Sequence, residues 1–150
     1  MNTAPSHPAT VESSIAWRLV FAAWLVAMIS TLGALFFSEV MHFPVCVLCW
    51  YQRIFMFPLA IILPLGLFPF DLRVVRYTLP LALIGGLLAV FHQLLVAGII
   101  PESIKPCTQG VPCSVTVATW FGFVTIPLLS ILAFCTVVAL LLAAHNRRDR

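Results

Sequence analysis

The sequence predicts an all-α integral membrane fold, a four-transmembrane-helix bundle with both termini in the cytoplasm. Hydrophobic residues make up 62% of the 150 residues and charged residues only 9%, whereas a soluble domain has about a quarter of its residues charged. Four long apolar runs follow one another, each near or above the ~17–25 residues with which a helix crosses the hydrocarbon core. A helix also satisfies its own backbone hydrogen bonds, which lipid cannot do. We therefore expect a single membrane domain.

The apolar runs set the expected domain organisation. Residues 1–16 are polar and predict a loose cytoplasmic tail. A membrane domain follows over residues 17–144, and residues 145–150 form a basic cytoplasmic tail. The expected spans are residues 17–37, 54–70, 79–100 and 121–144. The first run is longer than the ~7–15 residues of a signal-peptide core, so we expect it to be retained as a span.

The basic residues predict the orientation. Four spans place both termini and the loop at residues 71–76 on one side of the membrane. The cationic residues on that side are Arg18, Arg73, Arg76, Arg147, Arg148 and Arg150. The opposite side carries Arg53 and Lys105. Because Lys and Arg concentrate in cytoplasmic loops, we expect the loops at residues 38–49 and 101–120 to face outward.

The cysteines are divided between the two outward loops. Cys46 and Cys49 form a C-x-x-C at the end of the first loop, and Cys107 and Cys113 lie in the second. The fifth cysteine, Cys135, lies within the fourth apolar run and is expected to be a packing residue. Disulfides persist outside the cytosol but not within it. The distribution therefore favours thiol–disulfide chemistry.

The first pair stands before the second span, in a setting that favours a thiolate. Pro44 ends any preceding helix, so Cys49 is expected near the N-terminus of the next one, where free backbone N–H groups lower a thiol pKa. Arg53 follows one helical turn later and can stabilise an anion. His92 falls in the same outer half of the membrane. It either hydrogen-bonds between helices or lies near a bound polar headgroup.

The second pair lies in a turn-forming loop. Gly110 and Pro112 are turn residues, and a tight turn brings Cys107 and Cys113 within the ~4.4–6.8 Å between Cα atoms that a disulfide requires. A disulfide in such a loop is open to attack by a thiolate of another protein.

Two alternatives to redox chemistry are structural disulfides and a zinc site made of both pairs. A C-x-x-C disulfide closes a very small ring, which removes little entropy from the unfolded chain. Zinc sites favour two to four residues between paired cysteines, and the second pair is spaced more widely. We therefore expect redox-active cysteines and no metal. No basic stripe with interleaved aromatic residues indicates a nucleic-acid partner.

These motifs together resemble the disulfide bond formation protein B (DsbB) family. The resemblance rests on the stretch Pro44–Arg53, His92, the second cysteine pair, and Phe121-Gly122-Phe123 with Pro127. It extends over nearly the whole chain in span number and loop order. The short spacing of Cys107 and Cys113 is similar to the compact branch typified by Bacillus-type BdbC proteins. Gln52 stands where the family usually has an acidic residue.

The resemblance implies an enzyme of the bacterial inner membrane with its cysteine loops on the periplasmic or outer side. Such an enzyme reoxidises an extracytoplasmic thioredoxin-like thiol oxidase (DsbA-like) and passes the electrons to a membrane quinone, either ubiquinone or menaquinone. Cys46 and Cys49 match the quinone-proximal pair, with Cys49 contacting the quinone as a thiolate. Arg53 and His92 match the quinone-binding positions. Cys107 and Cys113 match the pair that exchanges with the partner protein.

Other classes share some of these features. A vitamin K epoxide reductase-like enzyme also joins a helical bundle, a C-x-x-C and a quinone, but its C-x-x-C comes late in the chain. A non-enzymatic membrane scaffold or metal transporter would hold its cysteines as structural groups. The sequence leaves open the oligomeric state, the kind of quinone and the order of transfer between the two pairs.

Overall fold

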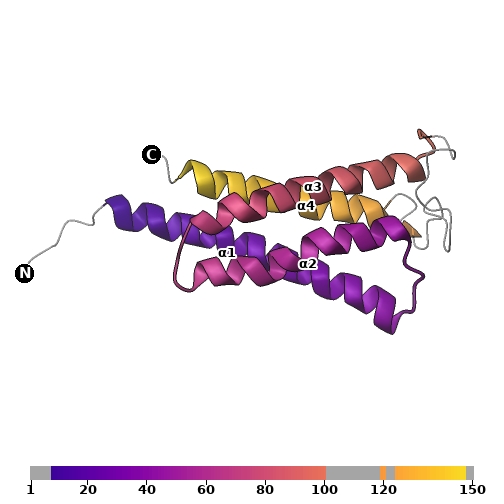
Figure 1. Ribbon diagram of the computed structural model, residues 1–150, viewed down its shortest axis with the longest axis horizontal. Coiled ribbons are helices and arrows are strands. Elements are labelled where there is room, and N and C mark those ends of the chain that lie inside the picture. The colour runs from indigo at the N-terminus through magenta and orange to yellow at the C-terminus, as the bar shows by residue number, and fades with distance from the viewer. Residues whose placement is uncertain (1–7, 101–118, 121–123, 148–150) are drawn as a thin grey trace, which may run out of the picture.

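The protein is a bundle of four long helices. The computed structural model describes residues 8–100, 119–120 and 124–147. The helices are α1 (Pro8–Leu35), which continues into the π-helical turn η1 (Phe36–Val40), α2 (Val47–Leu67), α3 (Arg73–Val96) and α4 (Ile126–Asn146). Two short antiparallel strands, β1 (Thr119–Trp120) and β2 (Val124–Thr125), precede α4. The start of α1, the end of α4 and the α2–α3 connection lie at one end of the bundle, and the η1–α2 connection lies at the other (Figure 1).

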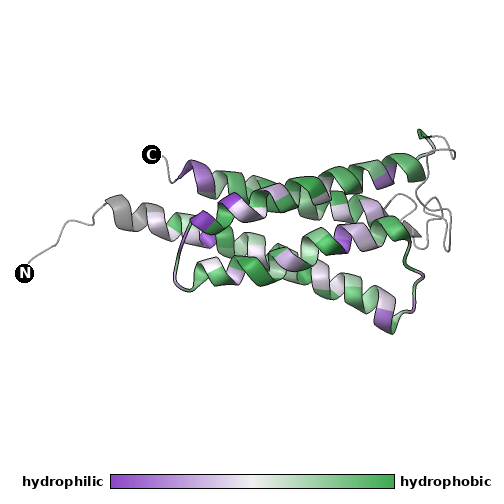
Figure 2. Ribbon diagram, in the orientation of Figure 1, coloured by the Kyte–Doolittle hydropathy of each residue, from purple (hydrophilic) through white to green (hydrophobic). Residues whose placement is uncertain are grey.

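Four segments of the described residues are long and apolar enough to cross a membrane. They are Ser13–Val40, Val47–Leu67, Arg73–Val96 and Ile126–Asn146. The predicted all-helical fold with four spans is therefore confirmed. Hydrophobic residues dominate the helices along most of their length (Figure 2). The side of the membrane on which the termini lie stays a prediction.

The helices start at other residues than the hydropathy pattern predicts. α1 begins at Pro8, within the stretch expected to be a loose tail, and proline is well tolerated in the first turn of a helix. α2 begins at Val47 instead of residue 54, because Cys46 caps it. The C-x-x-C therefore lies in the first turn of α2. α3 begins at Arg73 instead of residue 79, and α4 at Ile126 instead of residue 121, with Thr125 as its cap.

The bundle core is apolar and closely packed. Each helix packs against two neighbours in the cyclic order α1, α2, α3, α4. The buried side chains include Leu59 and Leu63 of α2 and Phe134 and Val137 of α4. Gly85 lets α3 approach α4, since a Cβ atom added there would overlap the ring of Phe134. Large apolar side chains elsewhere on the helices face outward, as expected of a surface in contact with lipid.

We expect Gly85→Ala to destabilise the bundle by about 1–3 kcal/mol, because Phe134 is buried and has little room to move. The measurement is thermal unfolding of the purified protein in detergent. Gly33→Ala is the matched control, because a Cβ atom there meets nothing within 4 Å. Equal melting temperatures for the two variants would contradict this account of the packing.

Candidate functional site

The C-x-x-C is positioned by the start of α2. Cys46 is the N-cap residue, with extended backbone angles of φ −77° and ψ 165°. Its Sγ accepts a hydrogen bond from the backbone N–H of Cys49 at 3.4 Å. A thiol thus takes the place that Ser, Thr, Asp or Asn usually occupies. The cap fixes both cysteines at the junction between the loop and the span.

The two sulfur atoms are close together. The Sγ atoms of Cys46 and Cys49 lie 3.0 Å apart and both thiols are free. A disulfide needs about 2.05 Å, so a small approach would join them. Cys46 is buried against Leu48 and Leu95, while Cys49 is only partly buried. The pair therefore has an inner and an outer sulfur.

The inner sulfur, Cys46, receives most of the hydrogen bonds. The hydrogen bond with the Cys49 thiol, together with His92 and the Cys49 backbone N–H, holds the pKa of the Cys46 thiol well below its usual range, although burial opposes the shift. From the sequence we expected the helix terminus to stabilise Cys49. The structure gives that backbone N–H to Cys46, because a cap residue accepts from the N–H three residues further along.

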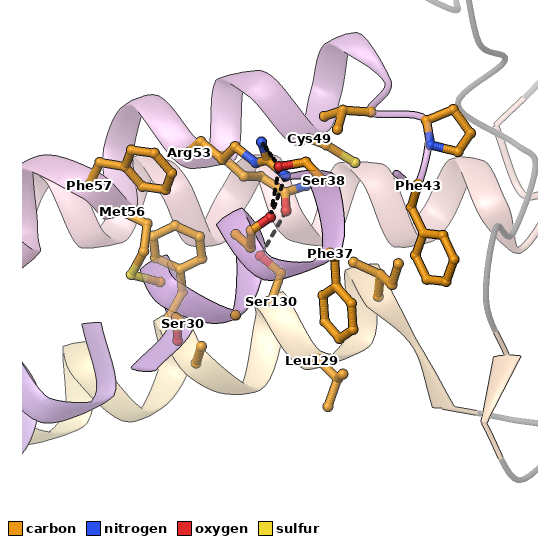
Figure 3. Close-up of a pocket in the computed structure, with 18 residues that line it drawn as sticks. Ser30, Phe37, Ser38, Phe43, Cys49, Arg53, Met56, Phe57, Leu129 and Ser130 are labelled. Carbon is orange, nitrogen blue, oxygen red and sulfur yellow. Dashed lines mark hydrogen bonds between the residues drawn. The ribbon is translucent and has the colours of Figure 1, made fainter. Parts of the chain in front are cut away.

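Arg53 lies one turn beyond Cys49 and joins α2 to the end of α1. Its Nη2 donates to the carbonyl oxygen of Ala34 at 2.8 Å, and its Nη1 donates to Ser38 Oγ at 3.2 Å (Figure 3). The guanidinium carbon also lies 5.3 Å from the ring centroid of Trp50. These contacts fix the cationic group near the end of the bundle at which α2 begins.

A row of buried polar groups reaches Cys46 from the neighbouring helices. Ser130 of α4 donates to Gln52 Oε1 at 2.7 Å, and Gln52 Nε2 faces His92 Nδ1 at 3.0 Å. His92 Nε2 in turn lies 3.7 Å from Cys46 Sγ. An amide nitrogen only donates, so Nδ1 accepts and the ring proton lies on Nε2, facing the sulfur. Gln52 therefore sets the tautomer of His92.

A cavity of about 230 Å³ opens beside the outer sulfur. Its walls come from α1, η1, α2 and α4, and its polar lining includes Cys49, Gln52, Arg53 and Ser130 (Figure 3). The remaining lining residues are mostly apolar, among them Phe37, Phe43, Met56, Phe57 and Leu129. The structure thus brings the predicted Cys49 and Arg53 together at one cavity.

The other predicted residues lie elsewhere. His92 is 3% exposed and contacts Cys46, and it is not among the residues that line the cavity. Its contact with a cofactor stays a prediction. Cys107 and Cys113 lie outside the described residues, so their role also stays a prediction. Cys135 was expected to be a packing residue, but its side chain is exposed on the outer surface of α4.

Two residues of the site, Gln52 and Ser130, were not recognised from the sequence. The family comparison marks Gln52 only as a departure from an acidic residue, and no sequence motif includes Ser130. A signal was present, because polar side chains within apolar spans are costly and tend to bond between helices. Which helices would meet was not readable from hydropathy.

The fold and the site define a class, a helical membrane protein with a C-x-x-C beside an apolar cavity. The DsbB family model, described as disulfide bond formation protein DsbB, matches residues 15–144. The chain belongs to this family. It is 49% identical over 136 residues to a probable disulfide formation protein of Metapseudomonas resinovorans, with 90% of this chain and 94% of the relative covered.

Further relatives carry similar names. Disulfide bond formation protein C of Bacillus subtilis is 49% identical over 125 residues, covering 81% of this chain and 89% of the relative. A probable disulfide formation protein of Deinococcus radiodurans is 45% identical over 131 residues, covering 81% and 85%. No solved structure matches the chain. The relatives favour disulfide formation over the vitamin K epoxide reductase-like and scaffold alternatives.

We expect Gln52→Leu to raise the pKa of the Cys46 thiol, because His92 loses the donor that directs its proton toward the sulfur. A lowered pKa means that the thiolate is present above that pKa and lost as the pH falls through it. The thiolate-to-thiol ratio of Cys46 should therefore fall about fivefold, and the midpoint of its titration should rise by about 0.7 pH units, if the hydrogen bond contributes about 1 kcal/mol.

The measurement is thiolate absorbance against pH in a chain with serine at Cys107, Cys113 and Cys135, with Cys46→Ser as the blank. Gln93→Leu is the matched control, because the amide oxygen of Gln93 accepts a hydrogen bond from Thr125. Identical titration curves for Gln52→Leu and Gln93→Leu would remove the role of Gln52.

Proposed function

We propose that this protein is a membrane thiol–disulfide oxidoreductase that reoxidises an extracytoplasmic thioredoxin-like thiol oxidase and passes the electrons to a membrane quinone. The observation that carries this proposal is the shared cavity of Cys49 and Arg53. A reactive pair that opens into an apolar space within a membrane helix bundle is suited to a lipid-soluble electron acceptor. Membership in a disulfide formation family supports the thiol chemistry.

The cavity suits the ring of a quinone. Its volume of about 230 Å³ is smaller than the ~300–1,000 Å³ of pockets for drug-sized ligands, and its walls are mostly apolar. Arg53 supplies a fixed cation that can donate to a carbonyl oxygen or stabilise developing negative charge. When bound, a quinone would accept the two electrons and two protons that the cysteine pair gives up on forming a disulfide.

The two cysteines have different roles in this scheme. Cys46 is the sulfur whose thiolate form the surrounding hydrogen bonds favour, at 3.0 Å from the sulfur that it must join. Cys49 is the sulfur that faces the cavity and so contacts the acceptor. His92 holds a proton beside Cys46, and Arg53 supplies positive charge on the cavity side. The pair is thus polarised from its inner to its outer member.

Electrons would reach this pair from Cys107 and Cys113. The loop that carries them starts beside the first pair, because Ile100 packs against the cluster of Cys46, Leu48 and Leu95. Cys107 follows Ile100 by seven residues, and an extended chain of that length spans up to about 25 Å. This reach is enough for Cys107 to serve both a partner protein outside the membrane and the sulfur pair at the start of α2.

We expect Arg53→Ala to weaken quinone use by about tenfold or more, since a hydrogen bond to a charged group contributes about 1.5–3 kcal/mol. The assay follows quinone absorbance after the purified protein is mixed with a reduced thioredoxin-like oxidase. Arg53→Lys separates loss of charge from loss of the contacts to Ala34 and Ser38. Arg73→Ala, at the opposite end of the bundle, is the control. An unchanged KM for quinone in Arg53→Ala would argue against the assigned role.

We expect Cys113→Ser to accumulate a mixed disulfide, because the Cys107 thiolate can attack the disulfide of the oxidised partner and no Cys113 thiol is present to release the product. Non-reducing gels of membranes in which both proteins are expressed would detect the complex. Cys135→Ser should give no complex, because that thiol lies on the outer surface of α4. A scaffold with structural cysteines would give no complex in either variant.

A further inference from the structure

We propose that reduced Cys46 and Cys49 form, with His92, a binding site for a soft divalent cation such as Zn²⁺ or Cd²⁺. The two Sγ atoms and a ring nitrogen of His92 all lie within 4.8 Å of one another. Two of these separations are 3.0 Å between the sulfur atoms and 3.7 Å between Cys46 Sγ and His92 Nε2. A tetrahedral zinc site with such ligands has edges of roughly 3.6–3.8 Å, so adjustments of about 1 Å complete it.

The donor set selects the kind of cation. Thiolate and imidazole ligands favour soft or borderline metals over Mg²⁺ and Ca²⁺, which take oxygen ligands. Binding of one divalent cation releases the thiol protons that the reduced pair still carries, and it leaves the two thiolates and the metal neutral together. Neutrality matters here because Cys46 and His92 are 7% and 3% exposed, and an unpaired charge at such a place is costly. This site differs from the four-cysteine zinc site that the sequence spacing disfavours.

The residues behind His92 also suit a metal ligand. A ligating histidine is normally held through its second ring nitrogen by another polar group. Here that group is Gln52, which is itself bonded to Ser130. Ligation through Nε2 moves the ring proton to Nδ1, and a half-turn of the Gln52 amide then presents its oxygen to that proton. Ser130 permits this half-turn because a hydroxyl can both donate and accept.

The cavity provides a route to the site and room for a fourth ligand. Cys49 lines the cavity, so a cation entering there reaches its sulfur first, and a water molecule can complete the tetrahedron. Arg53 lines the same cavity, and its positive charge opposes the cation. Arg53→Ala is therefore expected to tighten cation binding while it weakens quinone use. This opposite effect distinguishes the two occupants.

The site is controlled by the redox state of the cysteine pair. Disulfide formation joins the two sulfur atoms and removes both thiolate ligands, so the cation binds only the reduced protein. A bound cation in turn holds the pair reduced and prevents its oxidation. The inhibition rests on the proposed quinone-linked activity, but the binding does not.

The test uses the full-length chain with serine at Cys107, Cys113 and Cys135, reduced and then freed of reductant without oxygen. The probe is Cd²⁺ alone, followed by sulfur-to-cadmium absorbance and by calorimetry. We expect one Cd²⁺ per chain, no binding after the pair is oxidised, and affinity lowered about tenfold or more in His92→Ala. His145→Ala, a histidine near the end of α4, should bind as the parent does.

Equal binding by the oxidised and reduced proteins would overturn the proposal, and so would an unchanged affinity in His92→Ala. If that variant does not fold, Co²⁺ absorption of the parent chain still decides, because tetrahedral S₂N ligation and sulfur-only ligation differ in their spectra. The binding assay contains no quinone. A protein that binds Cd²⁺ but reduces no quinone would therefore keep this site and refute the proposed function.

Discussion

The cap that Cys46 places on α2 is the interaction on which the rest of the site depends. Its sulfur accepts the Cys49 backbone N–H, so the helix begins at the cysteine pair and not further along the chain. That start places Cys49 on the first turn and Arg53 on the second, and both then line the cavity. Replacing Cys46 with a residue whose side chain cannot accept a hydrogen bond would move the start of α2, and it would also remove a reactive thiol.

The second constraint is the cost of polar groups in an apolar bundle. Ser130, Gln52 and His92 come from α4, α2 and α3, and each finds its partner on another helix. Lipid offers no substitute for these hydrogen bonds, so the three helices are held in one register at the level of Cys46. The same bonds that align the helices direct the His92 proton toward the sulfur. Packing and chemistry are therefore set by one group of residues.

The sequence was sufficient for the features that depend on local order. The number of spans follows from the apolar runs, and the shared position of Cys49 and Arg53 follows from helical periodicity. The sequence alone does not show which sulfur accepts a free N–H at the start of α2, because that depends on which residue is the cap. Gln52 acquires its role only through His92, forty positions away. Contacts of that kind depend on how helices face one another, which hydropathy does not specify.

The two ends of the cysteine pair are electrostatically different, and this difference gives the site a direction. His92 lies beside the buried sulfur of Cys46, with its ring proton facing that sulfur. The permanent positive charge of Arg53 lies on the cavity side. An electron acceptor, which gains negative charge, is therefore favoured in the cavity. A free cation is disfavoured there until the disulfide is reduced and both sulfur atoms can become thiolates. The second thiolate then favours the cation, because its attraction to two negatively charged sulfur atoms exceeds its repulsion by the more distant guanidinium of Arg53. The reduced pair is therefore the form that meets both occupants: an electron acceptor oxidises it to the disulfide, whereas a soft cation holds it reduced.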